Sequence, residues 1–415
     1  MSFIESICRS AKAASALLAN IPGRKRSAAL RAAADAIVAA SAAIKTANAA
    51  DLAAAKERGL SAAMIDRLTL TDARISAMAD GLRQVAALPD PLARRLATFR
   101  RPNGLVISKV PVPIGVIAII FESRPNVAAD AAALCIKSGN AAILRGGKEA
   151  LASNCAIVDA MSAALAKAGI PEGAVQLVRT TDHADVRKLV KMEGLVDLVI
   201  PRGGESLVRA VMENARVPVL KHYNGICHIF VDASADLVEA LGIINNAKCQ
   251  RPGTCNAVEK VLVHKAIAKK FVPRLAKACA KWGVEVFADE AARAIEPSLK
   301  PATDADWTTE YLDLKLTLGV VDGVDAAIGH INRFGSHHSD AILTRDAASA
   351  EAFLKRVDSA AVYHNASTRF TDGGEFGFGC EMGISTDRMH ARGPVGIKEL
   401  TTYKYVVRGN GQIRG

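Results

Sequence analysis

Residues 113–126 read Pro-Ile-Gly-Val-Ile-Ala-Ile-Ile-Phe-Glu-Ser-Arg-Pro-Asn, a continuous apolar run followed by polar residues. A strand that is apolar at every position is typical of a parallel sheet covered on both faces. Similar runs alternate with helical patterns further along the chain. The predicted strands are 115–121, 141–145, 175–178, 195–200 and 217–220, and the predicted helices are 127–137, 150–167, 184–191 and 205–214. This alternation predicts an α/β fold with a doubly wound parallel sheet, whose ligands bind at the carboxyl ends of the strands.

Three residues in this region have the character of helix boundaries. Asn126 and Asp182 stand just before helical patterns and are predicted N-caps. Gly139 stands just after one and is a predicted helix stop, because glycine adopts the left-handed conformation that ends many helices.

A second strand-helix alternation begins near Asn224-Gly225, with predicted strands at 226–231, 258–263, 284–287, 341–344 and 360–364. Before the first alternation, residues 3–96 show helical spacing only, which predicts three or four helices and no strand. Residues 105–112 are predicted to be extended, with prolines suited to a sheet edge. Residues 401–408 alternate like a strand that pairs elsewhere. The chain is therefore predicted to hold two doubly wound parallel-sheet domains and a small β ribbon.

Composition narrows the class of protein. The 415 residues carry a net charge of +11, but the basic residues are scattered and only 4% are aromatic. This disfavours a nucleic-acid-binding protein, whereas a positive surface suits a phosphorylated substrate and cofactor. No apolar run reaches membrane-spanning length, because lysine, prolines and glycine interrupt residues 106–121. The eight cysteines have no CxxC pair and no zinc-ligand spacing, so we expect reduced thiols, no bound metal and a soluble cytoplasmic protein.

Residues 248–257, Lys-Cys-Gln-Arg-Pro-Gly-Thr-Cys-Asn-Ala, hold the candidate nucleophile. The Pro-Gly pair forces an irregular turn, and Cys255 follows it. Nearby cations lower the pKa of a thiol, and Lys248 and Arg251 are close in sequence. The alternative is that Cys255 is a small buried apolar residue like most cysteines. No GxGxxG fingerprint follows any predicted strand, so an ordinary dinucleotide site is not indicated.

Residues 113–126, residues 137–150 (Lys-Ser-Gly-Asn-Ala-Ala-Ile-Leu-Arg-Gly-Gly-Lys-Glu-Ala) and the cysteine loop together resemble the aldehyde dehydrogenase superfamily. Within it they look specifically like the family of gamma-glutamyl phosphate reductases. The resemblance covers nearly the whole chain, including residues 376–379 and 401–404. It implies five parts: N-terminal helices of the cofactor domain (1–104), an oligomerisation ribbon (105–114), an NADP-binding Rossmann-like domain (115–224), a catalytic domain (225–400) and a C-terminal oligomerisation strand (401–415).

The resemblance also implies roles for single residues. Cys255 takes the position of the catalytic cysteine. Arg145 takes the place of a lysine that holds the adenosine ribose. Lys148 takes the place of a glutamate that is common in NAD-preferring members. Because a cation at that position suits a 2′-phosphate, NADP(H) is the implied cofactor. Gly203-Gly204 occupy a turn where bare backbone brings pyrophosphate to a helix N-terminus, although a simple tight turn is the alternative. Glu310 aligns with a glutamate that holds the nicotinamide ribose.

Departures from the family pattern point to the substrate. Lys221 occupies the place of the glutamate that activates water in hydrolytic members. Ser123 occupies the place of the asparagine that helps to bind the oxyanion in those members. Arg124 and Arg251 stand in loops that meet at the site in the family fold, and an arginine suits bidentate contact with phosphate or carboxylate. Asn126 is grouped with them as a substrate-binding or phosphate-binding residue, and Ser123 with Cys255 as catalytic.

The resemblance implies NADPH-dependent reduction of L-glutamyl 5-phosphate to L-glutamate 5-semialdehyde and phosphate, through a thioester on Cys255. This is the second step of proline biosynthesis from glutamate. The alternatives are a coenzyme-A-acylating or hydrolytic aldehyde dehydrogenase and, in another class, a nucleic-acid-binding protein. A homo-oligomer, either a dimer or a tetramer, is expected.

Overall fold

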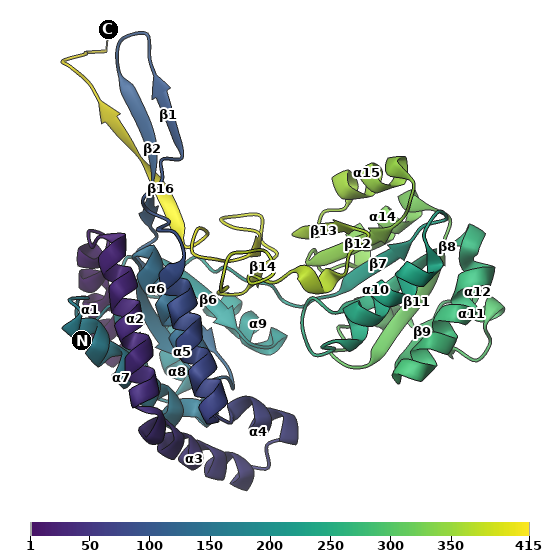
Figure 1. Cartoon of the computed structure of the whole chain (residues 1–415), viewed down its shortest axis with the longest axis horizontal. Coiled ribbons are helices and arrows are strands. Elements are labelled where there is room, and N and C mark those ends of the chain that lie inside the picture. Colours follow the sequence, from purple (N-terminus) through teal and green to yellow (C-terminus); the bar gives the residue numbers. More distant parts are fainter. Residues whose placement is uncertain (1, 415) are drawn as a thin grey trace. The chain divides into compact units, whose positions relative to one another are not determined.

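The computed structural model describes residues 2–414 and divides into two compact units (Figure 1). The first unit comprises Met1–Lys221, Gly377–Gly383 and Val395–Gly415, and the second comprises His222–Phe376 and Ile384–Pro394. Each unit contains a parallel sheet of its own. The predicted α/β architecture with two parallel-sheet domains is therefore confirmed.

The first unit opens with helices only. Within the described residues up to 96 there are five: α1 (Phe3–Leu18), α2 (Gly23–Ala39), α3 (Ser41–Glu57), α4 (Ala62–Leu68) and α5 (Asp72–Ala87). The side chains of Ser2, Ser61 and Thr71 accept hydrogen bonds from backbone N–H groups at the starts of α1, α4 and α5. The prediction of three or four helices was wrong, because α4 has only seven residues and is too short to show a period.

The first sheet has the strand order β5-β4-β3-β6 and is parallel throughout. Its strands are β3 (Val116–Phe121), β4 (Ala141–Arg145), β5 (Val175–Leu177) and β6 (Leu198–Arg202). The connecting helices are α6 (Asn126–Ser138), the short η1 (Lys148–Ala150), α7 (Leu151–Lys167), α8 (His183–Leu189) and α9 (Glu205–Asn214). Every residue of β3 and β4 is buried, which is why both strands read as continuous apolar runs.

Two of the predicted helix boundaries are confirmed and one is wrong. The Asp182 side chain caps α8 by accepting from the Ala184 N–H, and Gly139 ends α6 at φ +81°. Asn126 is not an N-cap, because α6 begins at Asn126 itself and its side chain donates to Asp130 at 2.9 Å. The strand predicted at 217–220 is also wrong, since this segment makes only an isolated bridge between Val199 and Val219.

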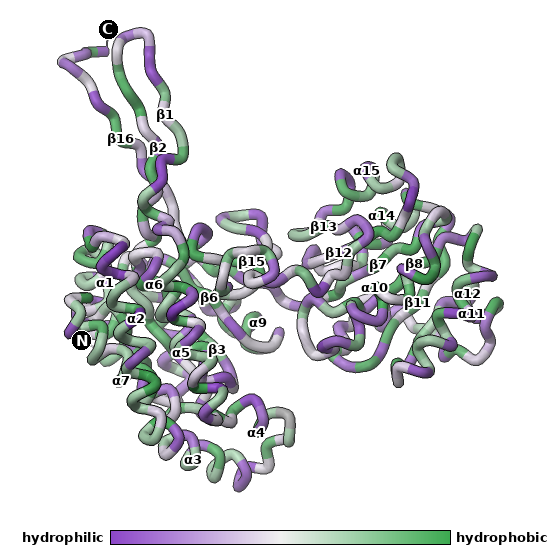
Figure 2. The backbone as a smooth tube through the Cα atoms, viewed as in Figure 1, coloured by the Kyte–Doolittle hydropathy of each residue, from purple (hydrophilic) through white to green (hydrophobic). Residues whose placement is uncertain are grey.

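The second sheet is also parallel, with the order β10-β9-β11-β8-β7-β12-β13. Its strands are β7 (Cys227–Val231), β8 (Val258–His264), β9 (Glu285–Ala288), β10 (Lys300–Pro301), β11 (Lys315–Val321), β12 (Ser339–Leu343) and β13 (Ala361–His364). The helices of this unit are α10 (Leu237–Cys249), α11 (Lys265–Trp282), α12 (Glu290–Ile295), α13 (Asp304–Thr308), α14 (Val324–Phe334), α15 (Ala347–Arg356) and η2 (Thr368–Phe370). Two further short strands, β14 (Ile384–Ser385) and β15 (Gly393–Pro394), pair antiparallel with each other. β7 is buried at every residue and β8 at every residue but His264, and Figure 2 shows hydrophobic colour among these central strands.

A three-stranded antiparallel ribbon stands clear of the helices of the first unit (Figure 1). It is formed by β1 (Ala97–Arg100), β2 (Val106–Pro113) and β16 (Thr401–Arg408), with β2 in the centre. The register runs from Thr401 opposite Pro113 to Arg408 opposite Val106. Residues 401–408, which were predicted to be a strand that pairs elsewhere, thus pair with β2, whereas β1 was not predicted.

The described helices were also compared with the length and hydropathy that a membrane span requires. No single one satisfies both criteria. Only α2 and α3 taken together do so, and they are bent by 65° at the break between them.

Candidate active site

Cys255 lies in the loop between α10 and β8, and its side chain is half-buried. Gly225 packs directly against this loop, because a Cβ atom on Gly225 would lie 1.8 Å from the carbonyl oxygen of Cys255 and 2.6 Å from its Cα. The same carbonyl accepts a hydrogen bond from the Cys227 thiol, with 3.2 Å between sulfur and oxygen. The backbone of the candidate nucleophile is therefore fixed from one side by the start of β7.

Arg369 in η2 binds side chains of the loop that contains Cys255. Its guanidinium donates to Gln250 at 3.0 Å, to Thr254 at 3.1 Å and to the Asn256 side-chain oxygen. The Asn256 amide in turn donates to the carbonyl oxygens of Arg369 and Thr371, at 3.3 and 3.0 Å. Both chain neighbours of Cys255 are thus tied to η2. Arg369 could not be predicted from the sequence, because it is distant from Cys255 in the chain and belongs to no motif.

The two cations close to Cys255 in sequence have different surroundings. Lys248 is buried and pairs with Glu259 at 3.2 Å, whereas Arg251 is exposed. Burial raises the pKa of Glu259 to about 7, against the opposing effect of Lys248 and Lys260. Lys248 is therefore held in an ion pair behind the loop.

Two histidines that the sequence did not single out lie beside the thiol. One ligand atom from each of His222, Cys255 and His338 lies within 4.8 Å of the other two. The two imidazole rings meet edge to face, with centroids 5.6 Å apart. Burial lowers the pKa of His338 to about 3, with a further contribution from His222. His338 is therefore a neutral imidazole at physiological pH.

Glu310 is connected to the Cys255 loop by its contact with Gly225. Its carboxylate accepts a hydrogen bond from the Gly225 N–H at 2.8 Å. The segment around Glu310 is anchored on β8, because Leu312 N–H donates to Glu259 at 3.3 Å and Lys260 donates to the Thr309 carbonyl at 2.8 Å. The structure thus joins Glu310 to the Cys255 loop through Gly225.

Two of the predicted cofactor residues of the first unit, Arg145 and Lys148, line a cavity of about 370 Å³. Arg145 and Lys148 are joined there by His183 and Arg187 from α8, two basic side chains that the sequence did not indicate. The Arg145 guanidinium donates to the carbonyl oxygens of Gly146 at 2.9 Å and Thr181 at 3.2 Å. Burial lowers the pKa of Arg145. Four basic side chains therefore line this cavity, together with the carboxylates of Glu122 and Glu149.

Ser123 lines the same cavity and donates two hydrogen bonds to Glu149. Both the Ser123 N–H and its hydroxyl donate to one Glu149 carboxylate oxygen, at 2.7 and 2.8 Å. Ser123 has a positive φ of 45°, which is uncommon for a residue other than glycine. Arg124, next in the chain, is exposed. The hydrogen bond from Asn126 is to Asp130, whose pKa burial raises to about 6.

Gly203 and Gly204 form the turn between β6 and α9, as predicted. A Cβ atom on Gly203 would lie 2.4 Å from a carboxylate oxygen of Glu122. The Gly204 N–H donates to the same oxygen at 2.9 Å. A carboxylate therefore already lies at the start of α9, where exposed N–H groups and the helix dipole favour an anion.

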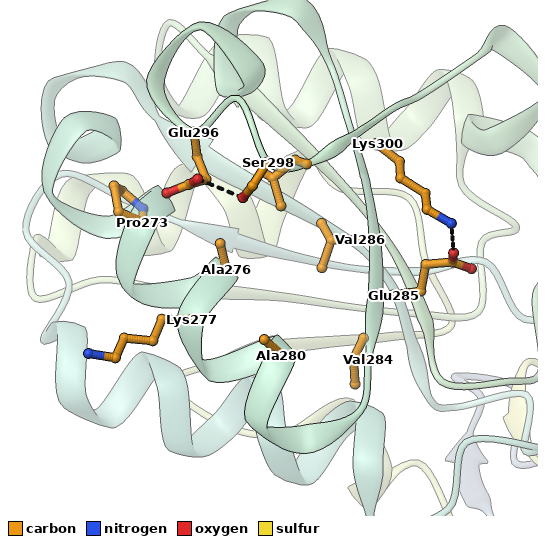
Figure 3. A pocket seen from close by; sticks show the side chains of 11 residues that line it. Pro273, Ala276, Lys277, Ala280, Val284, Glu285, Val286, Glu296, Ser298 and Lys300 are labelled. Carbon is orange, nitrogen blue, oxygen red and sulfur yellow. Dashed lines mark hydrogen bonds and ion pairs between the residues drawn. The ribbon is translucent and has the colours of Figure 1, made fainter.

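A separate cavity of about 400 Å³ lies between α11 and β9 (Figure 3). None of the predicted site residues lines it. Ser298 donates to Glu296 at 2.6 Å, and Lys300 pairs with Glu285 at its rim. These polar groups are already satisfied, so the cavity carries no evident chemistry.

The chain was compared with known protein families, sequences and structures. A model of the aldehyde dehydrogenase family matches residues 2–305. The chain is 54% identical to a gamma-glutamyl phosphate reductase of a Thermoanaerobacter species, over 99% of both chains. It is 53% identical to one from Carboxydothermus hydrogenoformans over the whole of both chains. The crystal structure of the gamma-glutamyl phosphate reductase of Thermotoga maritima superposes with a TM-score of 0.98, at 47% identity and complete coverage of both chains. The chain therefore belongs to the aldehyde dehydrogenase family and, within it, to the gamma-glutamyl phosphate reductases.

Proposed function

We propose that this protein uses NADPH to reduce L-glutamyl 5-phosphate to L-glutamate 5-semialdehyde and phosphate, the second step of proline biosynthesis from glutamate. The observation that carries the proposal is a cysteine fixed in a loop by Gly225 and Arg369, in a chain whose full-length relatives are named gamma-glutamyl phosphate reductases. A thiol held in this way, with its side chain still half-buried rather than enclosed, is suited to nucleophilic attack.

The proposed chemistry begins when the Cys255 thiolate attacks the acyl carbon of the substrate. The bond from this carbon to the phosphate oxygen breaks, inorganic phosphate leaves, and a glutamyl thioester forms on the sulfur. NADPH, when held by Arg145, Lys148 and Glu310, would supply the hydride that reduces the thioester carbon. The carbon–sulfur bond of the resulting thiohemiacetal then breaks, which releases the aldehyde and restores the Cys255 thiolate. The Cys255 N–H is the candidate donor to the oxyanion, and Ser123 is assigned a catalytic role.

The residues around the cavity in the first unit fit NADP(H). Arg145 is nearly buried and its Nε has no hydrogen-bond partner among the described residues, so a donor is available to a ligand. Lys148 and Arg187, both exposed, add positive charge for a 2′-phosphate. Gly203-Gly204 would admit the pyrophosphate to the start of α9 once the Glu122 carboxylate withdraws. Glu310 is assigned to the nicotinamide ribose.

Phosphate, rather than water or coenzyme A, is the proposed acyl acceptor in the reverse reaction. Arg124, Arg251 and Asn126 are assigned to the phosphate and the substrate carboxylate. Lys221 stands where hydrolytic members hold a base, and a positioned base is worth about 10²–10⁴-fold in rate. A lysine ammonium is a poor base, so hydrolysis of the thioester should be slow.

We also propose a homo-oligomer, a dimer or a tetramer, in the cytoplasm. Tyr403, Tyr405 and Val407 occupy alternate positions of β16 and therefore share one face of the ribbon. Their exposed fractions are 48%, 56% and 54%. An apolar face of this kind on an edge strand suits pairing with a second copy of the chain.

The test is oxidation of glutamate 5-semialdehyde with NADP⁺ in the presence of phosphate, coenzyme A or neither. Turnover should require phosphate, and Arg251→Ala should weaken the phosphate dependence while the Michaelis constant for NADP⁺ stays unchanged. Arg293→Ala, at an exposed position of α12, is the matched control. Rapid glutamate production without phosphate would place the protein among hydrolytic enzymes, and turnover with coenzyme A alone would place it among acylating ones.

A further inference from the structure

Three metal-ligating side chains from separate segments meet at the active-site cysteine. His222 begins the second unit, Cys255 lies in the loop before β8, and His338 immediately precedes β12. A ligand atom of each lies within 4.8 Å of the other two. Their meeting is produced by the fold of a single unit, since no local sequence motif joins them.

The orientation of both imidazoles is fixed by further contacts. His222 Nδ1 lies 2.7 Å from the Ile384 carbonyl oxygen, which can only accept, so Nδ1 carries a proton and donates it to this carbonyl. His338 Nδ1 lies 2.8 Å from the Ser339 hydroxyl, which is bonded to Thr371 at 2.6 Å. Such contacts orient metal-binding histidines in many proteins.

His338 is fully buried, and its Nε2 has no hydrogen-bond partner among the described residues. A buried polar atom of this kind is unfavourable unless a ligand or water satisfies it. The cluster therefore contains an unsatisfied nitrogen in addition to two other potential ligands.

We propose that His222, Cys255 and His338 form an inhibitory site for a thiophilic divalent cation, with Zn²⁺ as the best fit. One thiolate and two imidazoles make a three-ligand zinc set, and water completes the tetrahedron. Bond lengths of about 2.3 Å to sulfur and 2.0–2.1 Å to nitrogen require the three atoms to draw together by roughly 1 Å. Binding displaces the proton of the Cys255 thiol, so the sulfur is no longer available to attack the substrate.

The ligand set also predicts which cations are excluded. Mg²⁺ and Ca²⁺ prefer oxygen ligands, and the cluster contains none from a carboxylate. Inhibition should therefore be produced by Zn²⁺ but not by Mg²⁺ at the same free concentration. It should be reversed by a chelator, because the enzyme is blocked and not modified.

The experiment titrates the full-length, reduced, metal-free protein with Zn²⁺ alone and measures bound metal by equilibrium dialysis. One Zn²⁺ per chain should bind with a Kd on the order of 1 µM, and should protect Cys255 from alkylation, as read by peptide mass spectrometry. His222→Ala and His338→Gln should each weaken binding by at least about tenfold. Cys155→Ser and Cys249→Ser, which leave the cluster intact, should bind as the wild type does.

These readouts use no substrate, so a failure of the zinc site is distinguishable from a failure of the proposed function. Unchanged alkylation of Cys255 in the presence of bound Zn²⁺ would place the ion on other thiols and overturn the proposal. Equal affinity in wild type and both histidine variants would overturn it as well. A Co²⁺-loaded sample gives a second test, since a thiolate-to-metal absorption band should be present in the wild type and absent from Cys255→Ser.

Discussion

Glu310 accepts a hydrogen bond from the backbone N–H of Gly225 at 2.8 Å. The same glycine lies against the backbone of Cys255. A single residue without a side chain therefore connects the carboxylate assigned to the cofactor with the loop of the nucleophile. Because catalysis depends on the alignment of reacting groups, Gly225 fixes both partners at once.

Gly225→Ala should strongly reduce activity. The added methyl would lie 1.8 Å from the Cys255 carbonyl oxygen, and backbone atoms cannot move aside as a flexible side chain could. A displacement of the nucleophile by about 1 Å costs on the order of 10²-fold in rate, and overpacking lowers stability by about 1–3 kcal/mol. The kcat and the thermal midpoint should both fall. Gly242→Ala in α10, where a methyl meets nothing within 4 Å, is the control and should be as active as the wild type.

Lys148→Ala and Arg145→Gln should raise the Michaelis constant for NADPH far more than that for NADH. A charge-assisted hydrogen bond to phosphate contributes about 1.5–3 kcal/mol, which corresponds to roughly 10- to 100-fold. Initial rates with the two cofactors give the comparison. Lys167→Ala, at an exposed position near the end of α7, should change neither constant. Equal increases for NADPH and NADH would mean that these cations do not contact the 2′-phosphate.

Acid should destabilise the second unit through two histidines, His330 and His338. Burial lowers the pKa of both His330 and His338 to about 3, from an ordinary value of 6.5. Between these values the unfolded chain binds more protons than the folded one, so stability is fully present above pH 6.5 and is lost as pH falls. Each histidine contributes at most about 1.4 kcal/mol per pH unit. Thermal midpoints from pH 7 to 5 should fall less steeply in His330→Phe, and an unchanged slope would contradict this origin.

The sequence was most informative where burial is uniform and least informative where tertiary contacts decide. β3 and β4 are buried at every residue and were predicted almost to their ends. β11, inside the second sheet, was missed because Lys315, Thr317 and Gly319 interrupt its apolar pattern. The buried Thr317 is tolerated because its hydroxyl bonds to Tyr311 at 2.8 Å and to the Asp306 carbonyl at 3.1 Å.

The site shows the same division. Cys255, Arg145 and Gly203-Gly204 stand in continuous motifs and could be named from the sequence. Arg145 is the last residue of β4 and Gly203-Gly204 directly follow β6, so both lie at the carboxyl ends of strands, where ligand sites were predicted. His338 and Arg369 are distant from Cys255 in the chain, and only folding brings them to its loop. No local pattern distinguishes such residues from ordinary polar ones.

Replacing Tyr405 and Val407 together by aspartate should reduce the particle mass measured by light scattering. Buried charge would oppose association through this face of β16, whereas the backbone pairing with β2 would remain. Thr402→Asp, on the opposite face, is the control and should keep the wild-type mass. An unchanged mass in the double variant, and in a chain ending before Thr401, would show that the ribbon is not the oligomer interface.

A single-turnover experiment tests directly whether Cys255 carries the glutamyl group. Enzyme mixed with glutamate 5-semialdehyde and NADP⁺ without phosphate should release a burst of about one NADPH per site, because acylation precedes the phosphate-dependent step. Peptide mass spectrometry of the quenched sample should find the glutamyl adduct on Cys255, and added phosphate should remove it. Cys255→Ser should give no burst and Cys249→Ser a full one. A burst that survives in Cys255→Ser, or an adduct on another residue, would contradict the account.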